Sequence, residues 1–324
     1  MTEAARVIRP TAELPDRTGI GEAERLSQEQ FRDRYTQWVE GVQVHRAVPD
    51  PRLTLVVVSF RAKDYLLDCL RHLRDQTVAG QVSYEILLAD SGGLEHLRSR
   101  YGDLVDVDLR LRHGLPLNVA RNAAAAWARG ELVAYIDDDG LVARDWVAQA
   151  LEVMRDPQIA LARGRILPHR HPFFNLYAGH YDRGDAIWDD DSLATEGNMV
   201  ARRATYFEIG GFPDLFYGAE GCHLVYQLKQ AHPELRAVYA PGMVMRHDYC
   251  RTVREFVWKC RRYRTTNEDV SRDDPGFASF LATYRKKPKP SPRRSVAQRA
   301  ALRAMKASEW IIVRVDAFDR VERR

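Results

Sequence analysis

The feature that most constrains the fold is the unbroken apolar run LTLVVVSF at residues 53–60. A strand with one face in water alternates polar and apolar side chains. An uninterrupted β-branched run is instead typical of a strand buried on both faces of a mostly parallel sheet. A helical pattern follows over residues 64–75, where leucines recur every three or four positions. Because such a strand needs a helical layer on each side, this start predicts an α/β fold.

Strand and helix patterns continue to alternate along the chain. We predict further strands over residues 84–90, 105–111, 131–136, 159–166, 195–201 and 236–239 with an apolar continuation to 245, and helices over 118–129, 145–154 and 222–230. This order implies right-handed crossovers and a doubly wound sheet. Ligands of such sheets bind at the carboxyl ends of the strands, so we expect the polar residues there to form the site.

Three predicted strands end in polar clusters that should share one crevice, namely Ser59 with Phe60, Asp90, and the triplet Asp137–Asp139. Carboxylates crowded at the low-dielectric end of a buried strand repel one another, and a divalent cation would offset that repulsion. Oxygen ligands favour a hard ion, Mg²⁺ or Mn²⁺, and such ions commonly bind together with phosphates. The triplet therefore indicates a nucleotide diphosphate site, with a solvated acidic turn as the alternative.

A second acidic triplet, Asp189–Asp191, has the same composition but follows no apolar strand, so we interpret it as a polar loop. It lies in a long aromatic stretch, residues 167–194, that includes Trp188. Long irregular connections are commonly functional, and we expect this one to contact substrate. The pair His169 and His171 could bind zinc, but no further ligand lies at a supporting spacing.

The two ends of the chain differ from its centre. Residues 1–50 have the spacing of a helix, with one apolar stripe formed by Leu26, Phe31, Tyr35, Trp38 and Val42. The proline-interrupted segment RKKPKPSPRR at 285–294 predicts a linker to a terminal helix over 295–324. We therefore expect an N-terminal helical extension (1–50), a main domain (51–284, with a donor half to about 140 and an acceptor half from 141) and a basic tail (285–324).

Charge and cysteine content exclude several classes of protein. The net charge is +4, but residues 285–324 hold 13 Lys/Arg against 4 Asp/Glu, a net +9 that leaves −5 for the rest. We expect no nucleic-acid partner; the terminal helix could lie on an anionic membrane surface or pack on the protein or a second copy. The four cysteines form no CxxC pattern and are expected to be buried thiols. Without a spanning apolar run or a secretory signal, we expect a soluble, cytoplasmic protein.

Four segments in order resemble the inverting family-2 glycosyltransferases of GT-A fold, over about residues 53–247. The segments are LTLVVVSFRAKDYLLDCLRHLRDQT, YEILLADSGG, LPLNVARNAAAAWARGELVAYIDDDG and TEGNMVARRATYFEIGGFPD. The resemblance implies a doubly wound mixed sheet with flanking helical extensions. It also implies a metal-dependent transfer of a sugar from a UDP-, GDP- or dTDP-linked donor to a hydroxyl of a small-molecule or glycan acceptor.

The resemblance also implies roles for single residues. On the donor side stand Ser59, Phe60, Asp90, Arg121, Asp137 and Asp138; on the metal, Asp139 and His247; on the acceptor side, Asn198 and Trp188; as the base, Glu220. For two of these the residues alone leave alternatives open. A histidine at a strand end is commonly structural, and Arg121 with Asn122 could form a salt bridge and cap rather than contact Asp137 or the donor.

The chain departs from the family pattern at three positions. Arg61 stands where Asn is usual, and His223 stands where an acidic residue is usual. The Glu-Asp pair that supplies the base of an inverting transfer is Glu220-Gly221 here, which leaves Glu220 as the remaining carboxylate. Glu220 could instead cap the following helix, in which case Asp189–Asp191 or Asp214 would be examined as the base.

Two other functions remain open at this point. A sugar-nucleotide-binding module with weak or no activity is favoured by Gly221. A nucleotidyltransferase would share the sheet and the metal, but it would be expected to carry a glycine-rich basic loop after the first strand. The segment SFRAKDYL contains no glycine.

Overall fold

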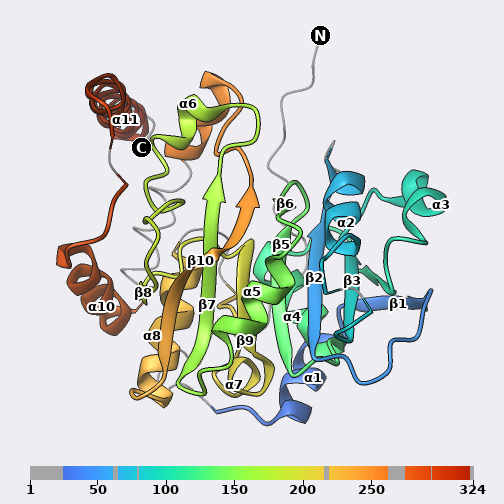
Figure 1. The fold of residues 1–324 in the computed structure, drawn as a ribbon. Helices are drawn as coiled ribbons and strands as arrows, with labels where there is room; N and C mark the ends of the chain where they lie inside the picture. Colours follow the sequence, from blue (N-terminus) through green and yellow to red (C-terminus); the bar gives the residue numbers. More distant parts are fainter. Residues whose placement is uncertain are drawn as a thin grey trace.

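The structure is a computed structural model, and it describes residues 25–60, 65–78, 80–214, 219–261, 274–292 and 294–321. Its centre is a ten-stranded mixed sheet in the order β1-β4-β3-β2-β5-β9-β7-β10-β6, with β8 paired to β10. Figure 1 shows this sheet running from β1 at one side to β10 and the terminal helices at the other. The predicted doubly wound mixed sheet is confirmed.

The strands have the following bounds: β1 Val39–Val44, β2 Leu53–Ser59, β3 Tyr84–Asp90, β4 Val107–Leu111, β5 Leu132–Asp137, β6 Leu141–Val142, β7 Ile159–Leu167, β8 Trp188–Asp189, β9 Asn198–Arg202 and β10 Arg236–Arg246. Strands β4, β3, β2 and β5 run parallel, as do β7 and β10. Strand β9 lies between the two groups and is antiparallel to both of its neighbours. The β5 and β10 strands therefore end at the same edge of the sheet.

Helices cover both faces of the sheet, which gives two separate apolar layers. On one face lie α2 Leu66–Arg74, α3 Arg98–Tyr101 and α5 Trp146–Val153; on the other lie α1 Gln28–Thr36, α4 Leu117–Trp127, α7 Arg203–Glu208 and α8 Glu220–Ala231. Further helices are the 3₁₀ turn η1 Glu95–Leu97, α6 Pro172–Asn175, α10 Pro275–Lys286 and α11 Val296–Val321, and residues 253–261 are also helical. This double coverage is why the apolar run of β2 shows no alternation.

Strand register brings the predicted polar ends together. Ser59 is the partner of Asp90 across β2 and β3, and Val58 is the partner of Asp137 across β2 and β5. In-register parallel strands end at one level, so these polar residues lie along one edge, as the sequence predicted.

The predicted helix over the N-terminal segment is wrong after Thr36. The helix α1 begins at a capping box on Ser27 and buries Phe31 and Tyr35, but residues 39–44 form β1, antiparallel to β4. Valines separated by Gly41 suit a strand better than a helix, and the open edge of β4 supplies the hydrogen-bond partners. The boundary near residue 50 stays a prediction, although β1 extends the central sheet.

The aromatic stretch 167–194 is more buried than the sequence suggested. The rings of Phe174 and Tyr181 are less than a tenth exposed and pack against Phe256 and Tyr249. Most of this aromatic content therefore builds a core beside β10, while Phe173 is 55% exposed.

The interpretation of the second acidic triplet as a polar loop is wrong for its central residue. Asp190 and Arg163 are both fully buried and form an ion pair. The guanidinium also lies 4.8 Å from the centre of the Tyr239 ring. Burial alone would raise the pKa of Asp190, but Arg163 and Ser192 outweigh it and hold the pKa below its ordinary value. The pair fastens the 167–194 segment to β7.

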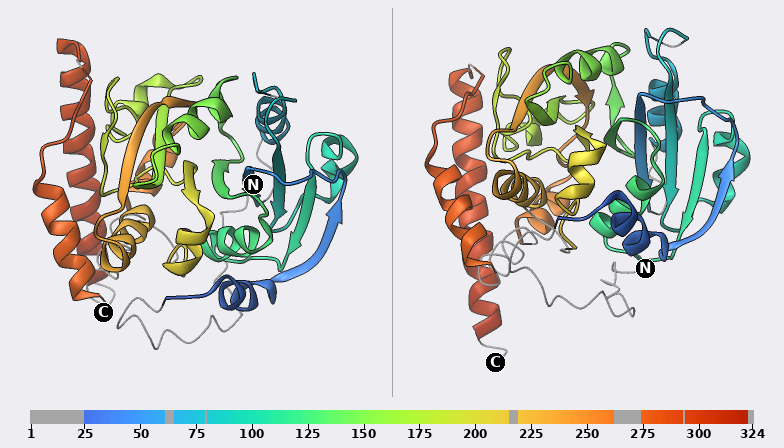
Figure 2. Two further views of the ribbon diagram at one scale, coloured as in Figure 1. Left: turned by 60° about the horizontal axis from the view of Figure 1, so that its bottom comes forward. Right: turned by 90° about the horizontal axis from the view of Figure 1, so that it is seen from below.

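The C-terminal segment contains one helix that the sequence pattern did not predict, α10, which ends at Lys286 and shortens the predicted linker. Figure 2 shows α11 lying along the side of the molecule next to α10. Its Met305 side chain is 5% exposed and belongs to the main apolar core. Among the described residues, none of the helices combines the length and apolar character that crossing a membrane requires.

We predict that Asp190→Asn lowers the free energy of unfolding by about 3 kcal/mol, because it leaves the Arg163 charge buried without its counter-charge. The measurement is urea unfolding at pH 7, with Asp189→Asn as the control, since the Asp189 side chain is 64% exposed. Because the native pKa of Asp190 is lowered, the difference should shrink as the pH falls through that pKa. Equal stability of the two variants at pH 7 would contradict a stabilising buried pair.

Candidate active site

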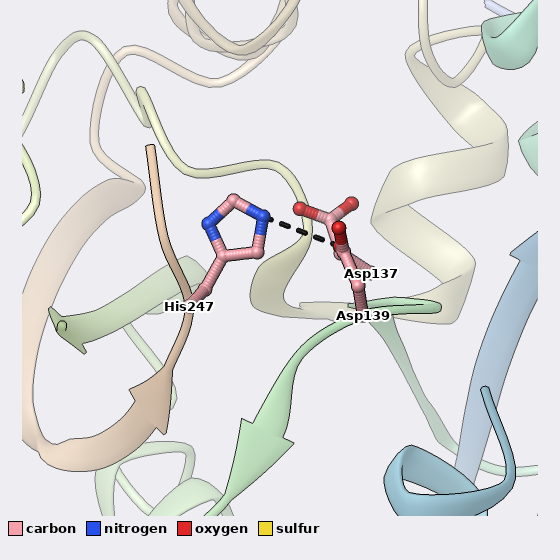
Figure 3. A group of neighbouring side chains, drawn as sticks. All are labelled: Asp137, Asp139 and His247. Carbon is pink, nitrogen blue, oxygen red and sulfur yellow. Dashed lines mark ion pairs between the residues drawn. The ribbon is translucent and has the colours of Figure 1, made fainter. Parts of the chain in front are cut away.

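Two carboxylates and an imidazole meet at the carboxyl end of β5. Asp137 is the last residue of β5, Asp139 follows in the turn, and His247 follows the end of β10. Figure 3 shows the His247 ring facing the two carboxylates. The His247 Nε2 atom lies 3.2 Å from Asp139 Oδ1, and one ligand atom from each of the three residues lies within 4.8 Å of the others.

Backbone and side-chain contacts fix the position of His247. Its backbone N–H donates to the Leu167 carbonyl at 2.9 Å, and Asn175 donates to its carbonyl at the same distance. The ring Nδ1 atom lies 3.3 Å from the Tyr181 hydroxyl. With Nδ1 engaged by Tyr181, Nε2 is the atom that points to Asp139.

This donor set fits a divalent cation. Two ligands held about 2.1 Å from one ion lie about 3 Å apart when adjacent and about 4.2 Å apart when opposite. The separations among Asp137, Asp139 and His247 fall close to that range. Two carboxylates with one imidazole suit Mn²⁺, and Mg²⁺ accepts the carboxylates. Among the described residues, this is the one group of three or more acidic, histidine or cysteine side chains with such spacing.

The contact between Arg121 and Asp137 is confirmed. The Arg121 Nη2 atom lies 3.5 Å from Asp137 Oδ1, and the guanidinium lies 5.2 Å from the centre of the Phe212 ring. Asn122 has a structural role instead, since it donates to the Phe212 carbonyl and accepts from Tyr206 and from the Phe212 N–H. The helix α4 thus holds both Arg121 and the turn that carries Phe212.

A glycine lets β9 begin directly against the Asp137 carboxylate. The Asp137 N–H donates to the Gly197 carbonyl at 2.9 Å, and a Cβ on residue 197 would lie 1.9 Å from the carboxylate carbon of Asp137. Real Cβ atoms do not approach this closely, so a side chain at residue 197 would push the Asp137 carboxylate out of its observed position.

The predicted donor-side residues separate into two groups. Ser59 donates to Asp138 at 2.6 Å, and both side chains are buried, so their contact ties β2 to the turn after β5 rather than facing a ligand. Asp90 accepts from the Gly92 N–H and from Arg98, and burial raises its pKa. Phe60 is 41% exposed. Among Ser59, Phe60, Asp90 and Asp138, Phe60 is thus the residue with an exposed surface that a bound nucleobase could contact.

His113, which sequence analysis did not consider, lies beside Phe60. Its ring lies 5.6 Å from that of Phe60, centre to centre, in the segment after β4. A lone histidine past a strand end carries no pattern that marks it, and only the sheet order brings it next to β2 and β3.

The two predicted acceptor residues do not line the metal cluster. Asn198 is fully buried; its amide accepts from Trp146 Nε1 at 2.8 Å and donates to two backbone carbonyls. Trp188 lies in β8, opposite Tyr239. Tyr239 pairs with residue 163 of β7, and the last residue of β10 pairs with residue 167. These four residues at 3.3 Å each place Trp188 about 13 Å from the end of β10 where the cluster lies. The Asn198 amide therefore has a structural role, and an acceptor contact of Trp188 stays a prediction.

Comparison with known proteins agrees with this geometry. Residues 54–211 match the family profile described as "Glycosyl transferase family 2". That stretch contains β2 through β9 and both aspartates of the cluster. Residues 54–211 therefore form a family 2 glycosyltransferase domain, and the sheet around them has the GT-A fold.

Named relatives extend the comparison. The chain is 27% identical to a putative glycosyltransferase, EpsH, of Bacillus subtilis over 110 residues, and 26% identical to a pre-mycofactocin glycosyltransferase of Mycobacterium tuberculosis over 148 residues. These matches cover 33% and 43% of this chain and 31% of each relative, so the chain spans about a third of their length.

A solved structure supports the fold over most of the chain. The mannosyltransferase PcManGT from Pyrobaculum calidifontis, in complex with GDP-Man and Mn²⁺, superposes with a TM-score of 0.52 at 17% identity. The match covers 90% of this chain and 92% of that one.

Glu220 lies beyond the matched residues 54–211, and it has a neighbour that sequence analysis did not consider. Glu220 is the first residue of α8, after Ala219 in a left-handed conformation with φ +60°. Glu196 lies beside it and accepts a hydrogen bond from the Gly221 N–H at 2.9 Å. Burial and the charge of Glu220 raise the pKa of Glu196 to about 7. The segment TEGN gave no sign of this pairing, because the two glutamates lie 24 positions apart in the sequence.

We predict that Gly197→Ala weakens Mn²⁺ binding at least about tenfold, because the new methyl group must displace the Asp137 carboxylate. Isothermal calorimetry with MnCl₂ measures the affinity directly. Gly102→Ala is the matched control, since a Cβ there meets no atom closer than 3.5 Å. An affinity within twofold of the parent would show that the close approach does not shape the cluster.

Proposed function

We propose that this glycosyltransferase moves a sugar from a nucleotide-diphosphate sugar to a hydroxyl of a small-molecule or glycan acceptor, with a divalent cation and with inversion at the sugar carbon. The observation that carries the proposal is the Asp137, Asp139 and His247 cluster at the ligand-binding edge of the sheet. The Mn²⁺ and GDP-Man of the structural neighbour support both the ion and the class of donor.

The residues of the site divide the work of holding the donor. Asp137, Asp139 and His247 would hold Mg²⁺ or Mn²⁺, which neutralises the charge that develops on the departing diphosphate. Arg121 keeps the Asp137 carboxylate in place through its 3.5 Å contact. Phe60 and His113 offer an aromatic surface for the nucleobase of the donor. The Asp90 carboxylate nearby can accept a hydrogen bond from the nucleobase or the ribose.

The acceptor hydroxyl loses a proton as it attacks, so an inverting transfer needs a carboxylate base near the donor. Two carboxylates lie on this side of the site: Glu220, which is buried at the start of α8, and Glu196 in the loop before β9, which is close enough to Arg121 to feel its charge. The family resemblance implies Glu220 for this role, whereas the contacts of Gly221 bring Glu196 to the same place. The choice of UDP, GDP or dTDP, the cytoplasmic location, and a membrane or self-association role for α11 stay predictions.

We predict that EDTA abolishes turnover and that Asp139→Asn lowers it by at least about a hundredfold, because the variant loses one of the charges that hold the cation. The assay follows release of nucleoside diphosphate from GDP-, UDP- and dTDP-sugars with added Mn²⁺.

Asp68→Asn is the control for this experiment, because Asp68 is an exposed residue of α2 that pairs with Arg71. Full turnover in Asp139→Asn, or after chelation, would contradict the metal assignment. Donor binding without any turnover in the parent protein would favour the alternative of a binding module.

A further inference from the structure

The absence of a side chain at residue 221 has a structural cause. A Cβ on Gly221 would lie 2.2 Å from the Leu193 carbonyl oxygen and 2.8 Å from Glu196 Oε1. The first contact is with backbone, which cannot swing aside, so an aspartate at this position does not fit the chain as folded. Residue 221 therefore lacks the family's carboxylate because the backbone around it is packed differently from what the family pattern implies.

In that arrangement, the Glu196 carboxyl group occupies the space next to the backbone of residue 221. Its Oε1 atom accepts the Gly221 N–H at 2.9 Å, in the first turn of α8, where the helix dipole favours negative charge. A Cβ on residue 221 would lie 2.8 Å from this same oxygen, so a side chain there and the Glu196 carboxyl group would compete for one space. Glu196 thus reaches, from the loop before β9, the region that the family pattern fills from α8.

Glu196 is also tied to the donor side of the site. The next residue, Gly197, lies against the Asp137 carboxylate. The Arg121 guanidinium contacts Asp137 and lowers the pKa of Glu196 through its charge. The Glu196 carboxyl group thus lies between Asp137 and the start of α8. The family pattern places its base at the start of α8.

We propose that Glu196 is the general base of the transfer, in the place of the carboxylate missing from residue 221. This inference rests on the proposed function and on inversion. In the step, the acceptor hydroxyl proton passes to a Glu196 oxygen while the acceptor oxygen bonds to the sugar carbon. The bond from that carbon to the diphosphate oxygen breaks, and its electron pair leaves with the nucleoside diphosphate.

The charged and titratable groups that face Glu196 suit it to this task. Burial, followed by the charge of Glu220 on α8, raises the pKa of Glu196, and Arg121 on α4 lowers it in part, which leaves a pKa of about 7. Burial, with smaller contributions from the charges of Asp190 and Glu196, raises the pKa of Cys222 on α8 to about 12, so it stays a neutral thiol. A base with a pKa near the working pH is ionised often enough to act and basic enough to take the proton. Glu220 then acts through Glu196, as the neighbouring charge that sets its basicity.

The test compares Glu196→Gln with Glu220→Gln. The assay is Mn²⁺-dependent hydrolysis of GDP-, UDP- and dTDP-sugars, with water as the acceptor, from pH 5 to 9. In the parent protein the rate should rise with pH through about 7, as Glu196 loses its proton. Glu196→Gln should lower the rate at least about a hundredfold and remove this rise. Glu220→Gln should keep the rate within about tenfold and move the rise to lower pH, because a repelling charge is gone.

Two further measurements separate a catalytic loss from a folding defect. The glutamine can still accept the Gly221 N–H, so thermal melting and calorimetric binding of the nucleoside diphosphate with Mn²⁺ should match the parent. If Glu196→Gln fails to fold, Glu196→Asp takes its place, with a lower rate but a retained rise with pH.

The proposal is overturned if Glu196→Gln keeps the parental rate and pH dependence, or if Glu220→Gln is the variant that loses the pH-dependent rise. NMR showing release of the sugar with retained configuration would also overturn it, since no such base is then needed. A parent protein that binds no nucleoside diphosphate with Mn²⁺ would instead refute the proposed function itself.

Discussion

Mutual repulsion among carboxylates at the end of β5 is the constraint around which this site is built. Asp137 and Asp139 lie at the end of the same buried strand, and the fold places a basic side chain next to each of them. Arg121 reaches Asp137 from α4, and His247 reaches Asp139 from the end of β10. These partners come from opposite halves of the domain, so the acidic strand end depends on the whole sheet being assembled.

Much of the central sheet could be predicted because its signals are local. The apolar runs of β2, β3 and β5 mark strands buried on both faces, and each predicted boundary lies within a residue or so of the observed one. The segment that became β1 failed because an edge strand gains its stability from a partner, here β4, which is distant in sequence. The apolar spacing around Trp38 satisfied a helical pattern only by coincidence.

The same distinction explains the site. Asp137, Asp139 and His247 could be chosen because each follows an apolar strand and matches the family pattern. Asn198 and Ser59 lie in matching segments too, but their side chains are taken by Trp146 and Asp138, which no linear pattern shows. Glu196 was missed because no linear pattern marks it. Its position next to Gly221 arises from the packing of the loop before β9 against α8.

The position of His247 carries a mechanical consequence. A cation bound by Asp139 and His247 would join two points of the chain 108 residues apart. Such a bridge would close a loop that includes most of the acceptor half. The bridge would reduce the conformational entropy of the unfolded chain only if the ion stayed bound to both residues in the unfolded state. Because the ligands come together only in the folded state, binding of the ion would instead favour folding by mass action. Ion concentration would then help to set how often the two halves of the sheet separate, apart from any part the ion has in catalysis.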